Sequence, residues 1–150
     1  MSALRETLNG RPPGLPPTLP STGQRRRLVL TDRRRPVAAS RAFARVALDD
    51  RSCPGTGDVE LVVTELVANA MLHADGPLDL VLDITAERFR IEVNDSSPVL
   101  PAAREPHVPT RPGGHGLVIV GLASDRWGTA PRPWGKTVWA EIDIRRSAES

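Results

Sequence analysis

The sequence predicts an α+β protein, a two-layer sandwich in which helices cover one face of a mixed, mostly antiparallel sheet. Two observations lead to this prediction. Apolar residues recur at helical spacing in three stretches, and they alternate with other residues in the remaining ordered segments. Along the chain these segments read strand, helix, helix, strand, strand, long loop, helix, strand, strand, and a tight turn at 86–87 indicates a hairpin.

The composition is that of a single globular domain. The chain has 150 residues, 39% hydrophobic and 25% charged, which is enough to bury a core. Its only cysteine excludes an internal disulfide. The first residues lack the apolar run of a signal peptide, and no apolar stretch approaches the roughly 18 residues of a membrane span. We therefore expect a cytoplasmic protein that makes no use of a membrane.

Proline and arginine mark the ends of the predicted domain. Proline and glycine recur through residues 1–24, where we expect a disordered leader. The domain should span 25–146, and 147–150 should be a frayed tail. Arginine runs lie on either side of a short first strand at 28–31. Since no aromatic residue interleaves them and no helix-turn-helix or zinc pattern follows, solvated charge is favoured over nucleic-acid binding.

Two helices should follow the first strand. Pro36 suits the first turn of a helix that runs to about Leu48. Its inward face is assigned to Ala39, Phe43, Val46 and Ala47. The second helix should begin near Asp58, whose carboxylate can cap the free N–H groups, and end at Ala74 before a turn. Its buried stripe comprises Val59, Val62, Leu66 and Ala70.

The second helix also carries a polar stripe. Glu65, Asn69 and His73 are four residues apart and therefore share one face. A solvated edge of an amphipathic helix would account for such a stripe. However, apolar residues border it on both sides, and its residue types are a base, a carboxamide metal ligand and an imidazole. The stripe is therefore a candidate wall of a functional site.

The second half of the chain should contain four strands, a lid and a helix. Alternation over 78–85 and 88–95 predicts the hairpin. The proline-rich loop 96–113 is long enough to be a functional lid or a disordered segment. A helix should span 115–124, followed by strands around 126–129 and 137–144 with a turn at 131–135 between them.

Glycines at the start of that last helix suggest an anion site. Gly113, Gly114 and Gly116 let the backbone approach a phosphate closely, where the helix N-terminus offers free N–H groups. Ordinary turn chemistry explains such glycines equally well. No Gly-Lys-Ser/Thr completes a Walker A pattern, and a loop rather than a strand precedes the glycines, unlike the Rossmann fingerprint.

Four motifs in a fixed order are more specific than any one of them. They are Glu-x-x-x-Asn at 65–69, Asn-Asp-Ser-Ser-Pro at 94–98, Gly-Gly-His-Gly-Leu at 113–117 and Gly-Lys-Thr-Val at 135–138. Together they resemble the GHKL ATPase superfamily of gyrase, Hsp90, histidine kinases and MutL, whose ATP-binding domain has the Bergerat fold. Over residues 25–144 the chain is most similar to small, histidine kinase-like anti-sigma factor serine kinases.

The resemblance implies roles for individual residues. Asn69 would hold the Mg²⁺ that bridges the ATP phosphates, and Glu65 would polarise the attacking water or serine. Asp95 would accept a hydrogen bond from the adenine amino group, although an Asp after a strand also commonly caps a turn. Thr137 would support the adenine contact through water. Gly114 and Gly116 would border the phosphates, with Leu117 anchoring the helix beneath them. His115 departs from the family pattern and would either contact phosphate when protonated or simply be tolerated. One of the lid arginines, Arg104 or Arg111, would reach the γ-phosphate as the lid closes.

The resemblance also implies a function. The chain would be an ATP-binding regulatory protein that acts as a serine/threonine protein kinase and anti-sigma factor. It would phosphorylate a STAS-type anti-sigma factor antagonist, sequester a sigma factor and form a homodimer through its first strand and helix. The alternative is a non-catalytic switch that binds a protein in response to ATP. His73 is assigned a structural role.

Overall fold

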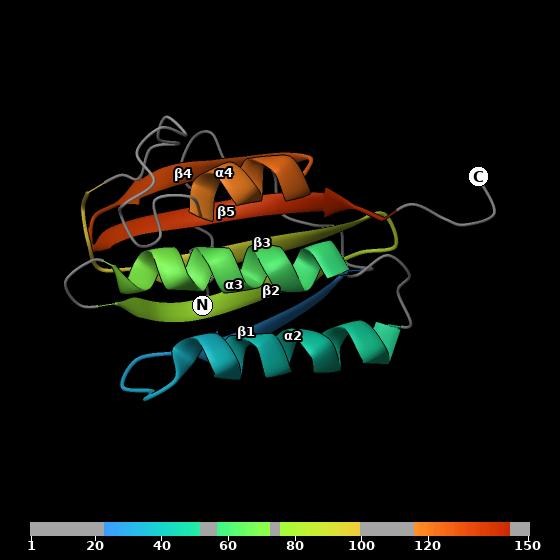
Figure 1. The fold of residues 1–150 in the computed structure, drawn as a ribbon, viewed down its shortest axis with the longest axis horizontal. Helices are drawn as coiled ribbons and strands as arrows, with labels where there is room; N and C mark the ends of the chain where they lie inside the picture. Colours follow the sequence, from blue (N-terminus) through green and yellow to red (C-terminus); the bar gives the residue numbers. More distant parts are fainter. Residues whose placement is uncertain (1–22, 52–56, 73–75, 100–115, 145–150) are drawn as a thin grey trace, which may run out of the picture.

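A five-stranded sheet carries three helices on one face (Figure 1), as the computed structural model shows over residues 23–51, 57–72, 76–99 and 116–144. The predicted α+β sandwich is therefore confirmed. Most of the leader and the lid lies outside the described residues. The elements are β1 (Gln24–Val29), α2 (Pro36–Arg51), α3 (Gly57–Met71), β2 (Pro77–Ile84), β3 (Arg88–Asp95), α4 (Gly116–Ala123), β4 (Arg126–Arg132) and β5 (Gly135–Asp143).

The strands lie in the order β1-β2-β3-β5-β4, and each neighbouring pair is antiparallel. The described part of the sheet is thus antiparallel throughout rather than mixed. Asp95 pairs with Pro77 on one side and with Lys136 on the other. The start of β2, the end of β3 and the start of β5 therefore meet at one edge of the sandwich.

The core lies between the sheet and α3. This helix occupies the centre of its layer, packs against α2 and α4, and covers β2, β3 and β5 (Figure 1). The stripe predicted for it is buried, and burying each such valine or leucine side chain contributes about 1.5–3 kcal/mol. Opposite it, alternate strand residues face the helices, including Leu80, Leu82, Phe89, Ile91, Val93, Val138 and Ala140.

Helix α2 uses part of the predicted face, since Ala47 is buried and Phe43 packs against the core. Its fully buried side chains are Ser40, Ala44, Ala47 and Leu48, whereas Val46 is 56% exposed. The assignment of Val46 to the core is wrong. At 3.6 residues per turn, Val46 lies about 160° around the helix from Ala44, so the two cannot face the sheet together. The contact stripe contains mostly small residues.

The last two strands are longer than predicted. β4 continues to Arg132 and β5 begins at Gly135, so the turn is confined to Pro133 and Trp134. Pro131 lies inside β4, opposite Lys136. β4 is the edge strand of the described sheet, where a residue without an N–H group is tolerated. The predicted turn at 131–135 was too long because it treated proline as a strand breaker.

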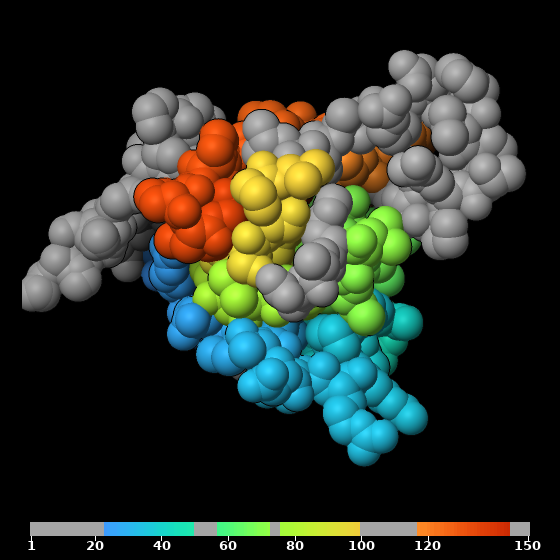
Figure 2. All heavy atoms as spheres, turned by 90° about the vertical axis from the view of Figure 1, so that its left-hand side faces the viewer, coloured from blue at the N-terminus to red at the C-terminus, as the bar shows by residue number. Residues whose placement is uncertain are grey.

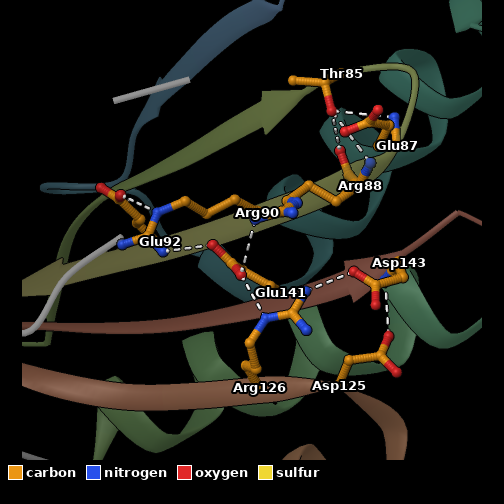
Figure 3. Close-up of polar contacts among 9 residues, drawn as sticks. All are labelled: Thr85, Glu87, Arg88, Arg90, Glu92, Asp125, Arg126, Glu141 and Asp143. Atoms are coloured by element: carbon orange, nitrogen blue, oxygen red, sulfur yellow. Dashed lines mark hydrogen bonds and ion pairs between the residues drawn. The ribbon is translucent and has the colours of Figure 1, made fainter. Parts of the chain in front are cut away.

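The face of the sheet opposite the helices buries charged residues (Figure 3). Arg90, Glu92 and Glu141 are between 0% and 3% exposed. The Arg90 guanidinium bonds Glu92 at 2.7 Å and Glu141 at 3.1 Å, and it lies 4.7 Å from the Trp139 ring centre. The alternation of β3 predicted burial on one face only, because it counted every charged residue as exposed. Pairing makes the burial of these charges tolerable.

The described helices also bear on membrane insertion. None of the helices in the described ranges is long and apolar enough to cross a membrane.

Candidate functional site

Ends of five elements converge at one side of the molecule. The sheet register brings the end of β3 to the starts of β2 and β5, and α3 ends at Met71, six residues before β2 begins. α4 begins at the same side (Figure 1). Figure 2 views this side, with the yellow segment after β3 lying between the red start of β5 and the green α3. Three of the four sequence motifs meet here, and the described part of the fourth opens α4.

Asn69 and Glu65 come to this side from the last turns of α3. Asn69 is only 7% exposed because its neighbours Leu66 and Ala70 hold α3 against the sheet, and its Nδ2 has no hydrogen-bond partner among the described residues. Glu65 is half-buried and bonds to no described residue. A buried polar atom without a partner costs about 1–3 kcal/mol. Both side chains are therefore available to a ligand.

Asp95 has one engaged and one unengaged carboxylate oxygen. Its Oδ1 accepts hydrogen bonds from the Ser97 backbone N–H and from the Lys136 ammonium, both at 2.9 Å. The Ser97 bond is the turn cap that an Asp after a strand commonly makes. Its Oδ2 is buried and has no partner among the described residues. The turn cap and a ligand contact are thus compatible, because they use different oxygens.

Lys136 is a site residue that the sequence analysis missed. Both it and Asp95 are 0% exposed, and its Nζ also donates to the Ser97 carbonyl oxygen at 3.3 Å. The available signal was the alternation of β5. Since Val138 and Ala140 face the helices, Lys136 must face them too.

Thr137 points to the opposite face of the sheet. Its hydroxyl donates to Asn94 Oδ1 and accepts a hydrogen bond of 2.9 Å from Arg132. Asn94 in turn donates to Asp79, which is paired with Arg27 at 2.7 Å. A row of side chains therefore crosses all five strands behind the site. The described neighbour of the Asp95 carboxylate is Lys136, and Thr137 belongs to this row.

Gly135 is a second missed residue, and its role is steric. It has φ +153°, and a Cβ built there would lie 2.1 Å from the Asp95 carbonyl oxygen and 2.7 Å from Ser96 Cα. Any side chain would collide with the backbone that carries Asp95. The glycine therefore lets β5 approach the end of β3 closely enough for Lys136 to reach Asp95.

The phosphate side of the predicted site is described only in part. Gly116 opens α4, and Leu117 is buried in the core, where it anchors the helix. The roles predicted for Arg104, Arg111, Gly114, His115 and His73 fall outside the described residues and stay predictions.

The donor set suits a metal that arrives with a nucleotide. Within the described ranges no group of three or more His, Cys, Asp or Glu could hold a metal ion. Mg²⁺ commonly takes only one or two protein oxygens and completes its octahedron with phosphates and water. Asn69, with Glu65 one turn earlier, fits that mode of binding better than a site made of protein ligands alone.

Comparison with known families agrees with this geometry. A family model for the histidine kinase-like ATPase domain matches residues 30–142, which includes all three helices and nearly all of β5. No curated protein matches the chain.

Proposed function

The chain belongs to the histidine kinase-like ATPase domain family, and from this premise we propose that it is an ATP-binding serine/threonine protein kinase and anti-sigma factor. Membership supports ATP binding and a regulatory role. The finer proposal rests on the four motifs. Its protein substrate would be a STAS-type anti-sigma factor antagonist, its second partner a sigma factor, and its assembly a homodimer.

One observation carries the proposal. Asn69 on α3 and Asp95 on β3 each have a buried polar atom without a partner among the described residues, and the fold brings both to the same side. Asp95 Oδ2 can only accept while the carboxylate is ionised, so it suits the amino group of adenine. The unpartnered atom of Asn69 is Nδ2, a donor that suits a phosphate oxygen, and the carboxamide oxygen of the same side chain would hold the Mg²⁺ of a bound nucleotide. Base and phosphate contacts are thus both provided.

The proposed reaction moves the γ-phosphoryl group to a serine hydroxyl. The bond between the γ-phosphorus and the bridging oxygen breaks to leave ADP, and a bond to the serine oxygen forms. Glu65, one turn from Asn69 on the same helix face, accepts the hydroxyl proton. Bound Mg²⁺ would neutralise charge on the phosphates.

A binding switch without catalysis is the second candidate. The observation that favours it is the isolation of Glu65, because a catalytic base is usually oriented by a further group and no described residue bonds to Glu65. In this case ATP would alter the affinity for a protein partner and would not be consumed.

Phosphoryl transfer with matched variants separates the two. The protein is incubated with γ-labelled ATP, Mg²⁺ and a panel of STAS proteins, alongside Glu65→Gln and Asn69→Ala. The kinase predicts labelled STAS protein with the wild type, no label with Glu65→Gln despite retained ATP binding, and weakened Mg²⁺-dependent binding with Asn69→Ala. ATP binding without transfer or hydrolysis supports the switch. Absence of binding to any adenine nucleotide contradicts both.

A further inference from the structure

The buried pair of Lys136 and Asp95 has an unused donor and an unused acceptor. Lys136 Nζ carries three N–H donors, and its contacts within the described residues are Asp95 Oδ1 and the Ser97 carbonyl oxygen. One donor is left over. Asp95 Oδ2 is the unused acceptor. Both side chains are fully buried, so bulk water does not satisfy these atoms.

The two unused groups are held in a fixed relation. The paired strands place Asp95 directly opposite Lys136. The two backbones can approach this closely because Gly135 has no side chain. The Ser97 N–H and the ammonium both bind Oδ1, so Oδ1 is the oxygen engaged by the turn and Oδ2 is left over. The pair therefore holds an unused acceptor and an unused donor on neighbouring strands at this edge.

We propose that Lys136 is a specificity-determining residue that donates a hydrogen bond to N1 of adenine while Asp95 Oδ2 accepts one from the N6 amino group. This rests on the proposed ATP binding. The Watson–Crick edge of adenine presents a donor at N6 beside an acceptor at N1, which complements this pair. Hypoxanthine and guanine present an acceptor at position 6 and a donor at N1, so both contacts would be repulsive.

Lys136 makes base selection stronger than a carboxylate alone would. When the wrong base enters, the spare donor of Lys136 meets a donor at N1 and Asp95 Oδ2 meets an oxygen at position 6, so two contacts are lost at once. Without the ammonium, the wrong base would meet only one unfavourable contact, between its oxygen at position 6 and the Asp95 carboxylate. The base preference should therefore depend on Lys136, while phosphate contacts contribute equally to all purine triphosphates.

A thermodynamic cycle that changes one group on the protein and one on the ligand tests the contact. Dissociation constants are measured by calorimetry for ATP and 1-deaza-ATP, which lacks the N1 acceptor, with wild type and Lys136→Met. We expect the wild type to bind 1-deaza-ATP about tenfold or more weakly than ATP, the value of one hydrogen bond to a charged group. The variant should bind the two within about twofold. Inosine triphosphate should bind the wild type more weakly than ATP does, and this difference in affinity should be smaller in Lys136→Met.

The ratio of affinities separates a contact from a merely structural role, because a partly unfolded variant loses both ligands equally. If Lys136→Met does not fold, the double variant Asp95→Asn/Lys136→Met removes both charges and leaves no unpaired buried ion. The inference is overturned if either folded variant keeps the wild-type preference for ATP over 1-deaza-ATP. It also falls if the wild type binds the two equally. If the wild type binds no adenine nucleotide, the proposed function fails first.

Discussion

The residue that tolerates least change at the site is a glycine. Gly135 lies where a Cβ would collide with the Asp95 carbonyl oxygen, and its φ of +153° is rare for other residues. We expect Gly135→Ala to lower the free energy of unfolding by about 3 kcal/mol or more, because β5 must move away from β3. Urea denaturation measures this loss.

Gly57 is the matched control for that substitution. It lies in the first turn of α3, and a Cβ built there meets nothing within 4 Å. Gly57→Ala should change stability by less than about 1 kcal/mol, in the stabilising direction, since alanine restricts the unfolded chain. Equal losses for the two variants would mean that the close approach at Gly135 is unimportant.

Single residues also show what a motif can and cannot predict. Asp95 and Asn69 were predicted from their motifs, and both lie at the converging edge with unpartnered polar atoms. In the Gly-Lys-Thr-Val motif the resemblance assigned the water-mediated adenine contact to Thr137. A motif gives the residue types but not the sheet face. Counting along β5 from Val138 places Lys136, rather than Thr137, on the face of Asp95.

At the scale of elements, the charged face of the sheet joins strands that are distant in sequence. Besides Arg90 on β3, Arg126 on β4 bonds Glu141 at 2.8 Å, and Arg25 on β1 approaches Asp83 on β2 at 3.4 Å (Figure 3 shows the part around Arg90). Hydrogen-bonded charges between strands specify which strand lies beside which. The cost is their desolvation.

Removal of Arg90 should be more damaging than removal of an exposed arginine from the same face. Arg90→Met leaves Glu92 and Glu141 buried without their shared partner, and we expect a loss of about 3–5 kcal/mol. Arg27→Met removes a largely exposed arginine from Asp79, which is buried but keeps its hydrogen bond from Asn94, and should cost less, about 1–2 kcal/mol. Denaturant unfolding compares the two. Similar small losses would mean that the buried network contributes nothing to stability.

An ion pair between Arg45 on α2 and Glu60 on α3 joins the two helices, and its contribution to stability depends on pH. The Arg45 guanidinium donates to Glu60 at 2.8 Å and 3.0 Å, and this hydrogen bond lowers the pKa of Glu60 and raises that of Arg45. Because the folded-state pKa of Glu60 is depressed, its contribution to stability is present above the ordinary glutamate pKa of about 4.3 and lost as the pH falls further.

The matched substitution is Arg45→Gln. At pH 7 this variant should be less stable than the wild type, and the difference should shrink as the pH falls below about 4.3, since protonated Glu60 no longer benefits from the arginine. Thermal unfolding from pH 7 to pH 3 follows both proteins. A difference that stays constant with pH would show that Arg45 acts through packing alone.

Elements with strong periodicity were predictable to within a few residues. α3, β2 and β3 were located from runs of apolar residues at regular spacing. α2 was located, but only part of its inward face was predicted, because alanines and a serine carry little hydrophobic signal. The buried charges of Arg90, Glu92 and Glu141 on β3 and β5 were not predicted, for a related reason. Sequence patterns assume that charge is exposed, and only the register shows that Arg90 has two carboxylates to pair with.

At the scale of the whole molecule, the site exists because the chain returns to one edge. Asn69, Asp95, Gly116 and Lys136 are separated by roughly 20 residues each, and each lies near the end of a different element. Antiparallel pairing brings two of these ends, those of β3 and β5, together with the start of β2. The order of the motifs predicted that they form one site. The order β1-β2-β3-β5-β4, which no local pattern encodes, accounts for their actual proximity.

Ligand binding at such an edge should stabilise the entire domain, because the site draws on most of its elements. At a nucleotide concentration about 100 times Kd, linkage adds about 2.7 kcal/mol to the free energy of unfolding. For a domain of this size that corresponds to a rise in Tm of about 5–10 °C. We expect this rise with Mg²⁺ and ATP in differential scanning fluorimetry, and a smaller one when EDTA removes the metal.

The base contact should account for much of that rise. Asp95→Asn places an amide at the proposed adenine contact and leaves Lys136 without its counter-charge, so the variant should start from a lower Tm and gain little on adding ATP. Asp32→Asn is the matched control, since Asp32 is exposed and has φ 67°, a conformation that asparagine adopts readily. Its ATP-induced rise should equal that of the wild type. A full ATP-induced rise in Tm for Asp95→Asn would mean that the base binds elsewhere. Loss of the rise in both variants would mean that the substitutions act by disturbing the fold and not through a contact of Asp95.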